Sequence, residues 1–168
     1  MLDIKDVCIV RYDKEKYKES MKSFDCGSPT FNAFIYIACH YGTTFLIVRE
    51  STDEIVGFLS FCASSIKYEQ KVFPAIELKL FAIDKKWHGY KIGDETIAQI
   101  FLELFLNHFR EISKTVIKAD YIILFSLDQR SRRFYNRANF IEVGSTISEK
   151  SVMKGCFENN CIPMFLRI

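Results

Sequence analysis

The stretch LFAIDKKWHGYKIG, residues 80–93, decides the fold of this chain. Its first four residues are apolar, as at the end of a strand, and Gly89 and Gly93 mark a tight turn. The mostly apolar segment that follows predicts a long helix from about Tyr90 to Ile112. A strand, a glycine turn and a helix N-terminus in this order present backbone N–H groups and partial positive charge to an anion. The sequence therefore predicts an anion-binding turn over residues 88–93.

The elements on either side of this turn follow from the spacing of apolar residues and from turn signals. The predicted strands are residues 6–12, 43–49, 55–66, 74–84, 121–127, 140–147 and 163–168, and the predicted helices are residues 13–21, 29–41, 90–112 and 130–138. This order predicts an α/β fold with a mixed sheet, in a single domain that covers residues 1–168.

The composition is that of a globular protein with a substantial core. Of the 168 residues 49% are hydrophobic, which excludes a disordered chain, and the net charge of +2 does not by itself identify a nucleic-acid-binding protein. The N-terminal residues alternate charged and apolar side chains, unlike an export signal, and the longest apolar segment, residues 97–109, is interrupted by Gln99, Glu103 and Asn107. We therefore expect a cytoplasmic protein without a membrane span.

Six cysteines are present, and their spacing matches no zinc-binding pattern. They are Cys8, Cys26, Cys39, Cys62, Cys156 and Cys161. Because nothing indicates an oxidising compartment, we expect plain thiols and no metal site.

A second motif follows the strand at residues 121–127. Asp128-x-x-Ser131-x-x-Phe134-Tyr135, followed by Asn139-Phe140, resembles the D-x-x-A-x-x-F-Y…G-F signature of the GNAT superfamily of acetyl-CoA-dependent N-acetyltransferases. Asn139 occupies the usual glycine position, and asparagine tolerates the left-handed conformation better than most residues. The resemblance implies the GNAT (acyl-CoA N-acyltransferase) fold, a mixed, mostly antiparallel central sheet flanked by about four helices.

The same resemblance extends to the turn over residues 88–93, where the superfamily carries the pattern R/Q-x-x-G-x-G/A. Gly93 matches that pattern, whereas His88 and Lys91 depart from it. The resemblance implies acetyl-CoA as co-substrate, with its pyrophosphate on this turn and its pantetheine arm on the preceding strand. The implied binding residues are Phe81, Ala82, Ile83, His88, Gly89, Tyr90, Lys91, Ile92 and Gly93. An ordinary strand–helix turn is the alternative.

Two residues are candidates for proton transfer. The resemblance implies that Tyr135 lies near the cofactor sulfur, where a phenol would protonate the leaving thiolate. Glu77 lies four residues before Phe81, where histone-type members of the superfamily carry a general base. The alternatives are a buried aromatic pair for Tyr135 and a solvated carboxylate paired with Lys79 for Glu77.

The segment FDCGSPTFNAF, residues 24–34, and the ending IPMFL, residues 162–166, resemble GNAT-type toxins of bacterial toxin–antitoxin modules. Such toxins acetylate aminoacyl-tRNA, a polyanion that needs many phosphate contacts. Here the basic residues cluster only at Arg130, Arg132, Arg133 and Arg137. We therefore expect transfer of acetyl to a primary amine of a small molecule or protein, with the toxin activity, and hence a nucleic-acid partner, as the alternative.

The identity of the amine acceptor does not follow from the sequence. A non-catalytic acetyl-CoA-binding or interaction module is the third interpretation, because a fold does not determine a function. The many aromatic residues are compatible with a homodimer.

Overall fold

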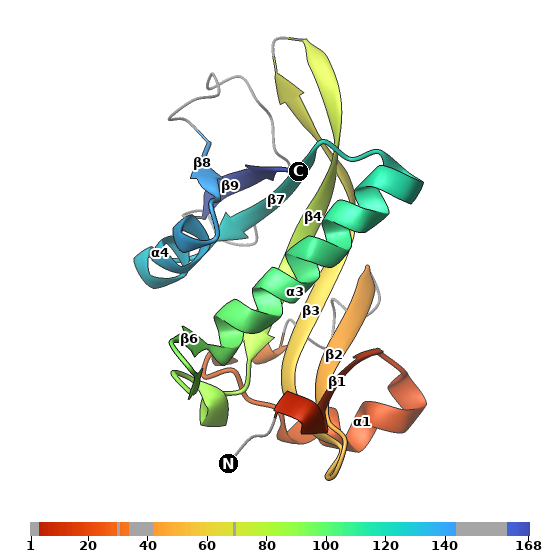
Figure 1. The fold of residues 1–168 in the computed structure, drawn as a ribbon, viewed down its shortest axis with the longest axis vertical. Coiled ribbons are helices and arrows are strands. Elements are labelled where there is room, and N and C mark those ends of the chain that lie inside the picture. The colour runs from red at the N-terminus through yellow and green to blue at the C-terminus, as the bar shows by residue number, and fades with distance from the viewer. Residues whose placement is uncertain (1–3, 30, 34–41, 69, 144–160) are drawn as a thin grey trace. The chain divides into compact units, whose positions relative to one another are not determined.

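The structure is a computed structural model that describes residues 4–29, 31–33, 42–68, 70–143 and 161–168 (Figure 1). The strands are β1 (Val7–Arg11), β2 (Thr43–Arg49), β3 (Glu54–Tyr68), β4 (Lys71–Ile83), β5 (Lys91–Ile92), β6 (Glu95–Thr96), β7 (Tyr121–Ser126), β8 (Ile141–Glu142) and β9 (Ile162–Arg167). The helices are α1 (Lys14–Ser23), α3 (Ile97–Ile112) and α4 (Gln129–Arg137), with short helical turns at Ile4–Asp6, Lys85–Trp87 and Ser113–Ile117. None of the described helices is long and apolar enough to cross a membrane.

Seven strands form one sheet in the order β1-β2-β3-β4-β7-β9-β8, and β5 pairs with β6 in a separate hairpin. The long strands β3 and β4 lie side by side (Figure 1). The β1–β2, β2–β3, β7–β9 and β8–β9 pairs are antiparallel, whereas β4 and β7 are parallel. The mixed, mostly antiparallel sheet confirms the predicted fold class.

The described residues form two compact units, and strands β3 and β4 and helix α3 each contribute to both. The first unit contains Met1–Cys62 and Lys79–Ile100. Its core forms where α1 packs on the sheet, since Tyr17 and Met21, one helical turn apart, are both buried there. The Asp13 side chain begins α1 by accepting hydrogen bonds from two backbone N–H groups of its first turn.

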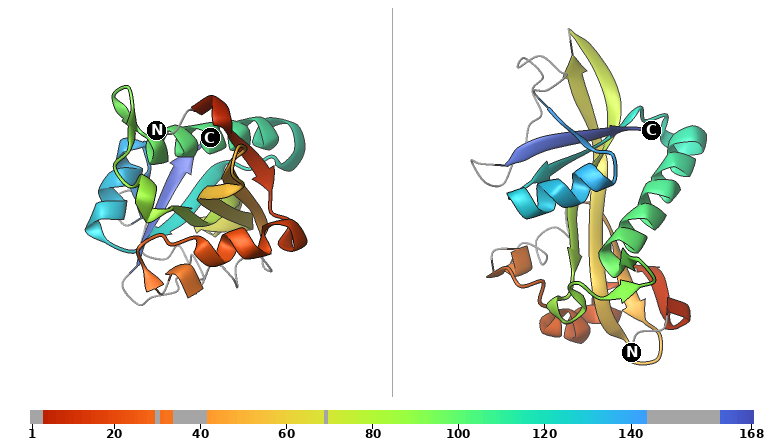
Figure 2. Two further views of the ribbon diagram at one scale, coloured as in Figure 1. Left: turned by 90° about the horizontal axis from the view of Figure 1, so that it is seen from below. Right: turned by 60° about the vertical axis from the view of Figure 1, so that its left-hand side comes forward.

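The second unit contains Ala63–Leu78 and Phe101–Ile168. Its central strand is β7, which pairs with β4 on one side and β9 on the other. An apolar run suits that position, because both faces of a central strand are covered. Helix α4 follows β7 directly and lies against it (Figure 2).

Most predicted elements are confirmed within one to three residues, but the long helix is not. We expected it to begin near Tyr90, whereas α3 begins at Ile97. The β5–β6 hairpin takes up the intervening residues, pairing Lys91 with Thr96 and Ile92 with Glu95. The expected anion-binding turn therefore leads into a hairpin rather than directly into a helix.

Three other expectations meet the structure only in part. The predicted helix 29–41 is helical at Pro29 and at residues 31–33, and its remainder lies outside the described residues. The predicted strand 140–147 is described only as β8 and the residues next to it. Cys161 is disulfide-bonded, which corrects the expectation of plain thiols, whereas Cys8, Cys26 and Cys62 form no disulfide.

The end of α4 explains the pairing of Phe134-Tyr135 with Asn139-Phe140 in the sequence. Phe140 N donates to Tyr135 O at 3.1 Å and Asn139 N donates to Asn136 O at 3.0 Å. These bonds satisfy the last carbonyls of the helix and require a left-handed residue between them. Asn139 fills that position with φ +66°, as predicted. The Phe140 ring then packs on the Tyr135 ring, with centroids 5.7 Å apart.

This helix end predicts opposite effects for two substitutions of Asn139. Asn139→Gly should leave stability unchanged or slightly higher, because glycine adopts a positive φ without steric cost. Asn139→Val should destabilise the protein by about 1–2 kcal/mol, because its Cβ is crowded in the left-handed conformation. Urea unfolding of both variants measures the difference, and equal stabilities would contradict this account of the helix end.

Candidate active site

Tyr135 is held by a helix that is fixed at its beginning as well as at its end. Asp128 and Ser131 form a reciprocal capping box: Ser131 N donates to Asp128 Oδ1 at 2.6 Å, and Asp128 N donates to Ser131 Oγ at 3.1 Å. Ser126, the last residue of β7, reaches the Ser131 hydroxyl at 2.8 Å. The D-x-x-S part of the motif is thus a helix start joined to a central strand.

The Tyr135 side chain is 9% exposed and lies between two phenylalanine rings. Phe134 and Phe140 each contact it edge-on, at centroid distances of 5.2 and 5.7 Å. Burial raises the pKa of the Tyr135 phenol above its usual value. The hydroxyl therefore stays protonated throughout the physiological pH range, as a proton donor must.

Glu77 lies on β4 and is 4% exposed, which excludes the solvated carboxylate that was its alternative interpretation. Its neighbours across the sheet are apolar, because Glu77 pairs with Ile123 and Ile123 pairs with Phe165. Ser64 Oγ donates a hydrogen bond to Glu77 Oε2 at 3.2 Å. A buried carboxylate needs such partners, because leaving it unpaired in an apolar setting is costly. Glu77 is thus a buried carboxylate that a hydrogen bond holds in place.

Strands β4 and β7 stop pairing before either strand ends. The ladder runs from Ala75–Tyr121 to Leu78–Leu124, although β4 continues to Ile83. Beyond Leu78 and Leu124 the two strands no longer pair. Phe81, Ala82 and Ile83, the implied pantetheine-binding residues, lie in this last part of β4.

The turn after β4 is fixed by its own side chains and open on one side. His88 Nε2 hydrogen-bonds to Ile83 O at 2.9 Å, so the ring in the expected Arg/Gln position ties the turn back to β4. Gly89 and Gly93 have positive φ angles, of +73° and +65°, and a Cβ at either would meet no atom of the described residues within 4 Å. The buried Trp87 Nε1 has no hydrogen-bond partner in the described part of the chain. Open glycines and an unmatched donor fit an acceptor-rich ligand such as a pyrophosphate.

The N-terminus of α3 is less suited than the turn to binding an anion, because three of its backbone N–H groups already have partners. Thr96 and Gln99 form a second capping box, with Thr96 N donating to Gln99 Oε1 at 2.9 Å and Gln99 N to Thr96 Oγ1 at 3.3 Å. Ile97 N donates to Tyr90 O at 2.9 Å. The helix thus satisfies these three donors within the chain. Its start was visible in the sequence as T-x-x-Q, a signal that the apolar pattern obscured.

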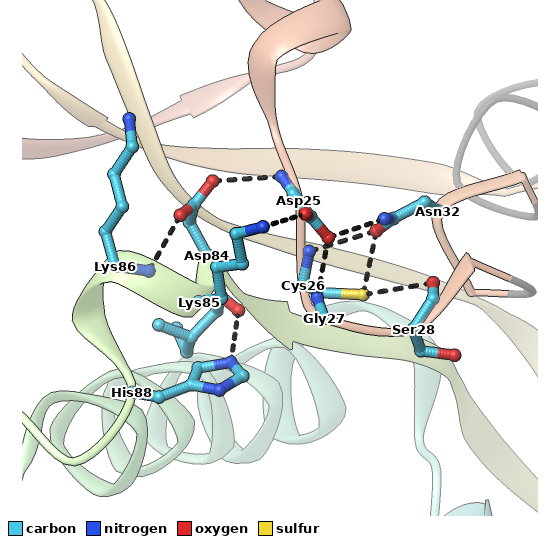
Figure 3. Close-up of polar contacts among 10 residues, drawn as sticks. Asp25, Cys26, Gly27, Ser28, Asn32, Asp84, Lys85, Lys86 and His88 are labelled. Atoms are coloured by element: carbon cyan, nitrogen blue, oxygen red, sulfur yellow. Dashed lines mark hydrogen bonds and ion pairs between the residues drawn. The ribbon is translucent and has the colours of Figure 1, made fainter.

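A network of hydrogen bonds around Asp25 joins the turn to the loop after α1 (Figure 3). Asp25 Oδ2 lies 2.5 Å from Lys85 Nζ, and Asp25 Oδ1 accepts from Asn32 Nδ2 at 2.7 Å and from Gly27 N at 2.8 Å. Lys85 N donates to Asp25 O at 2.7 Å. The Lys85 ammonium above all, then the Asn32 amide and the Gly27 N–H, hold the pKa of Asp25 well below its usual value.

Asp84 completes this network from the end of β4. The residue is 2% exposed, and its two oxygens accept from Asp25 N and from Lys86 N, both at 3.0 Å. Lys86 Nζ in turn contacts Glu54 at 3.1 Å. Because Lys85 and Lys86 already have carboxylate partners, Lys91 is the exposed lysine of the turn without one among the described residues.

The structure distributes the predicted site residues over the two units. Glu77 and Tyr135 belong to the second unit, and residues 81–83 and 88–93 belong to the first. Sequence reasoning singled out the FDCG segment only by resemblance and assigned it no contact. The partners of Asp25 in this network, Asp84 and Lys85, are about 60 residues farther along the chain. No local sequence pattern reveals contacts over such a separation.

No protein-family model and no curated protein matches the sequence. Solved structures do match over almost the whole chain. A tyrosine-to-phenylalanine variant of the toxin AtaT, bound to the C-terminus of the antitoxin AtaR and acetyl-CoA, matches with a TM-score of 0.70 and 17% identity, over 96% of this chain and 93% of that one. AtaT complexed with acetyl-methionyl-tRNAfMet matches with a TM-score of 0.69 and 18% identity, over 96% and 95%. The KacTA–DNA complex matches with a TM-score of 0.71 and 18% identity, over 96% and 92%. The chain has the fold of these toxins, and the predicted GNAT fold is confirmed.

The Asp25 network predicts a stability contribution that disappears in acid. Asp25→Asn and Lys85→Met should each lower the melting temperature at neutral pH. Because the folded state depresses the pKa of Asp25, its contribution is fully present above about pH 4 and is lost as the pH falls below that value. The difference between wild type and Asp25→Asn should therefore shrink in acid.

Glu19→Gln is the matched control, because it breaks an exposed pair with Lys22 within a single helix. Thermal unfolding from neutral pH to about pH 3 compares the three variants, in the acid range where an aspartate titrates. An Asp25→Asn variant as stable as Glu19→Gln at neutral pH would show that the network does not stabilise the fold.

Proposed function

We propose that this chain is an acetyl-CoA-dependent N-acetyltransferase whose acceptor is the α-amino group of an aminoacyl-tRNA. The observation that carries the proposal is the match over nearly the full length to AtaT, of which one structure holds acetyl-CoA and another an acetylated aminoacyl-tRNA. This acceptor was the alternative in the sequence analysis, where the small net charge favoured a small or protein amine. The similar structures support the alternative better.

The co-substrate would lie along the last part of β4 and the turn after it. Backbone groups of Phe81, Ala82 and Ile83 would hold the pantetheine arm, and the turn from His88 to Gly93 would hold the pyrophosphate. The open sides of Gly89 and Gly93 would let the phosphates approach the backbone closely. Lys91 would supply the positive charge, because Lys85 and Lys86 already pair with carboxylates.

The reaction would be direct attack of the amine on the acetyl carbonyl in a ternary complex. The nitrogen must lose a proton, and Glu77 is a buried carboxylate that can accept it directly or through a water. The sulfur leaves as a thiolate, and the Tyr135 hydroxyl, which remains protonated at physiological pH, can donate a proton to it. The C–N bond forms, the C–S bond breaks, and the two protons are accounted for.

A non-catalytic module is the competing proposal, and the capped α3 terminus is the observation that favours it. Isothermal titration with acetyl-CoA, followed by a transfer assay, separates the two. Absence of binding would favour an interaction module, binding without acetyl transfer would favour an acetyl-CoA-binding module, and binding with transfer would support the enzyme.

The acceptor is tested by comparing bulk aminoacyl-tRNA with a panel of small primary amines and lysine peptides. We expect acetyl transfer from labelled acetyl-CoA to aminoacyl-tRNA, and transfer that weakens as salt rises because phosphate contacts release counterions. Transfer to small amines alone, insensitive to moderate salt, would contradict the tRNA acceptor and restore the first expectation.

Tyr135→Phe removes one hydroxyl and should leave the fold intact. Similar structures include tyrosine-to-phenylalanine variants, so this fold accepts such a change. Loss of a general acid typically lowers the rate about 10²–10⁴-fold. The measurement is single-turnover transfer at saturating acetyl-CoA, with Tyr121→Phe as the control for removing a hydroxyl elsewhere in the second unit. Equal rates for both variants would remove Tyr135 from the mechanism.

A further inference from the structure

Helix α4 carries an excess of positive charge on the side that does not face the protein. Its sequence, QRSRRFYNR, contains four arginines and no acidic residue. Arg130, Arg133 and Arg137 recur at i, i+3 and i+7, so they share one face of the helix. All three are exposed. We call these three residues the α4 arginine face.

The fourth arginine of the helix, Arg132, forms an ion pair with a carboxylate. Arg132 Nε lies 3.1 Å from Glu142 Oε1, with both side chains about one-third exposed. No carboxylate pairs with the other three in the part of the chain that the structure describes. Among the described residues, the charge partner of Arg130 is Asp128: hydrogen bonds from Ser131 and, to a smaller extent, Arg130 lower the pKa of Asp128, although Arg130 and Asp128 form no ion pair. Arg133 and Arg137 have no carboxylate within ion-pair distance in that part of the chain.

The α4 arginine face is also held rigidly. The helix is capped at its start by Asp128 and Ser131, and Tyr135 packs between two aromatic rings on the opposite side. At 3.6 residues per turn, Tyr135 projects roughly 160° from the middle of the arginine face. A helix with one side anchored in the core presents its other side without the entropy cost of ordering a loop.

The chemistry that matches three unpaired guanidinium groups is a row of phosphates. Guanidinium binds phosphate bidentately and stays charged at every physiological pH. The run from Arg130 to Arg137 spans about 10 Å at 1.5 Å per residue. A nucleic-acid strand carries a row of phosphates along its backbone, so a run of this length can face more than one of them.

We infer that the α4 arginine face binds the phosphate backbone of the acceptor RNA, on the side of α4 opposite Tyr135. The choice of RNA rests on the proposed function, whereas the surface itself rests on the three unpaired arginines. Proteins recognise double-stranded RNA mostly by its shape and its backbone rather than by its base sequence. A surface of three arginines, which bind phosphates, suits that mode of recognition.

The test measures binding of the full chain to unfractionated deacylated tRNA by filter binding, between about 50 and 200 mM salt, the range where phosphate contacts dominate affinity. The variant is Arg130→Gln/Arg133→Gln/Arg137→Gln. Each lost contact should reduce the slope of log affinity against log salt by about 0.7–0.9, so the triple variant should lose about 2–3.

Two controls remove the same charge elsewhere. Lys14→Gln/Lys18→Gln/Lys71→Gln neutralises three exposed lysines and should leave the slope unchanged. Arg132→Gln removes an arginine from the same helix and should have a smaller effect on the slope than any single change in the arginine face. If the triple variant fails to fold, by circular dichroism, the three single variants should each lose about 0.7–0.9 of the slope.

Several outcomes would overturn the inference. These are a triple variant with the wild-type slope, an equal loss in the lysine control, or no tRNA binding by the wild type. Acetyl transfer is measured separately on the same proteins. Transfer with an unchanged slope would reject the surface alone, whereas salt-sensitive tRNA binding without transfer would reject the proposed function alone.

Discussion

The hydrogen bonds and the ion pair of the Asp25 carboxylate join three segments of the first unit. The two oxygens of that carboxylate receive the Lys85 ammonium from the turn after β4, the Asn32 amide from the start of the next helix, and the Gly27 N–H from its own loop. These three segments have no common strand or helix to align them. One charged acceptor with well-placed donors does so instead, and charge-assisted hydrogen bonds are the stronger kind. The turn proposed to receive the phosphates is positioned by this contact before any ligand arrives.

Helix α4 has a similar role in the second unit. Its start is joined to β7 through Ser126 and Ser131, and its end is fixed by the left-handed Asn139. A short helix is marginal by itself, so these caps and the packing of Tyr135 and Phe140 supply its stability. The same constraints that bury a phenol on one side expose the arginines on the other. In the proposed function, proton transfer and RNA binding would therefore lie on opposite faces of this nine-residue helix.

Elements with a strong local pattern were predictable from the sequence. Strand β7 is a continuous apolar run, and α4 carries both cap residues and the asparagine that ends it, so the fold class and the place of Tyr135 followed. The β5–β6 hairpin was missed because the apolar pattern of α3 continues upstream of its cap at Thr96. The Asp25 network was missed because it joins residues about 60 positions apart. The burial of Glu77 was equally out of reach, since it depends on neighbours in β3 and β7.

The capping box of Thr96 and Gln99 has a consequence for how this fold diverges. Where a helix end relies on a glycine-rich turn and its bound phosphates, each residue of the turn is under steric constraint. Here the helix completes its first turn with its own side chains, so substitutions such as the lysine at position 91 do not endanger it. A lineage with such a self-sufficient helix start is free to lose the recognisable motif. The chain keeps a fold similar to that of AtaT at 17% identity, and its helix start does not depend on the glycine pattern of the turn.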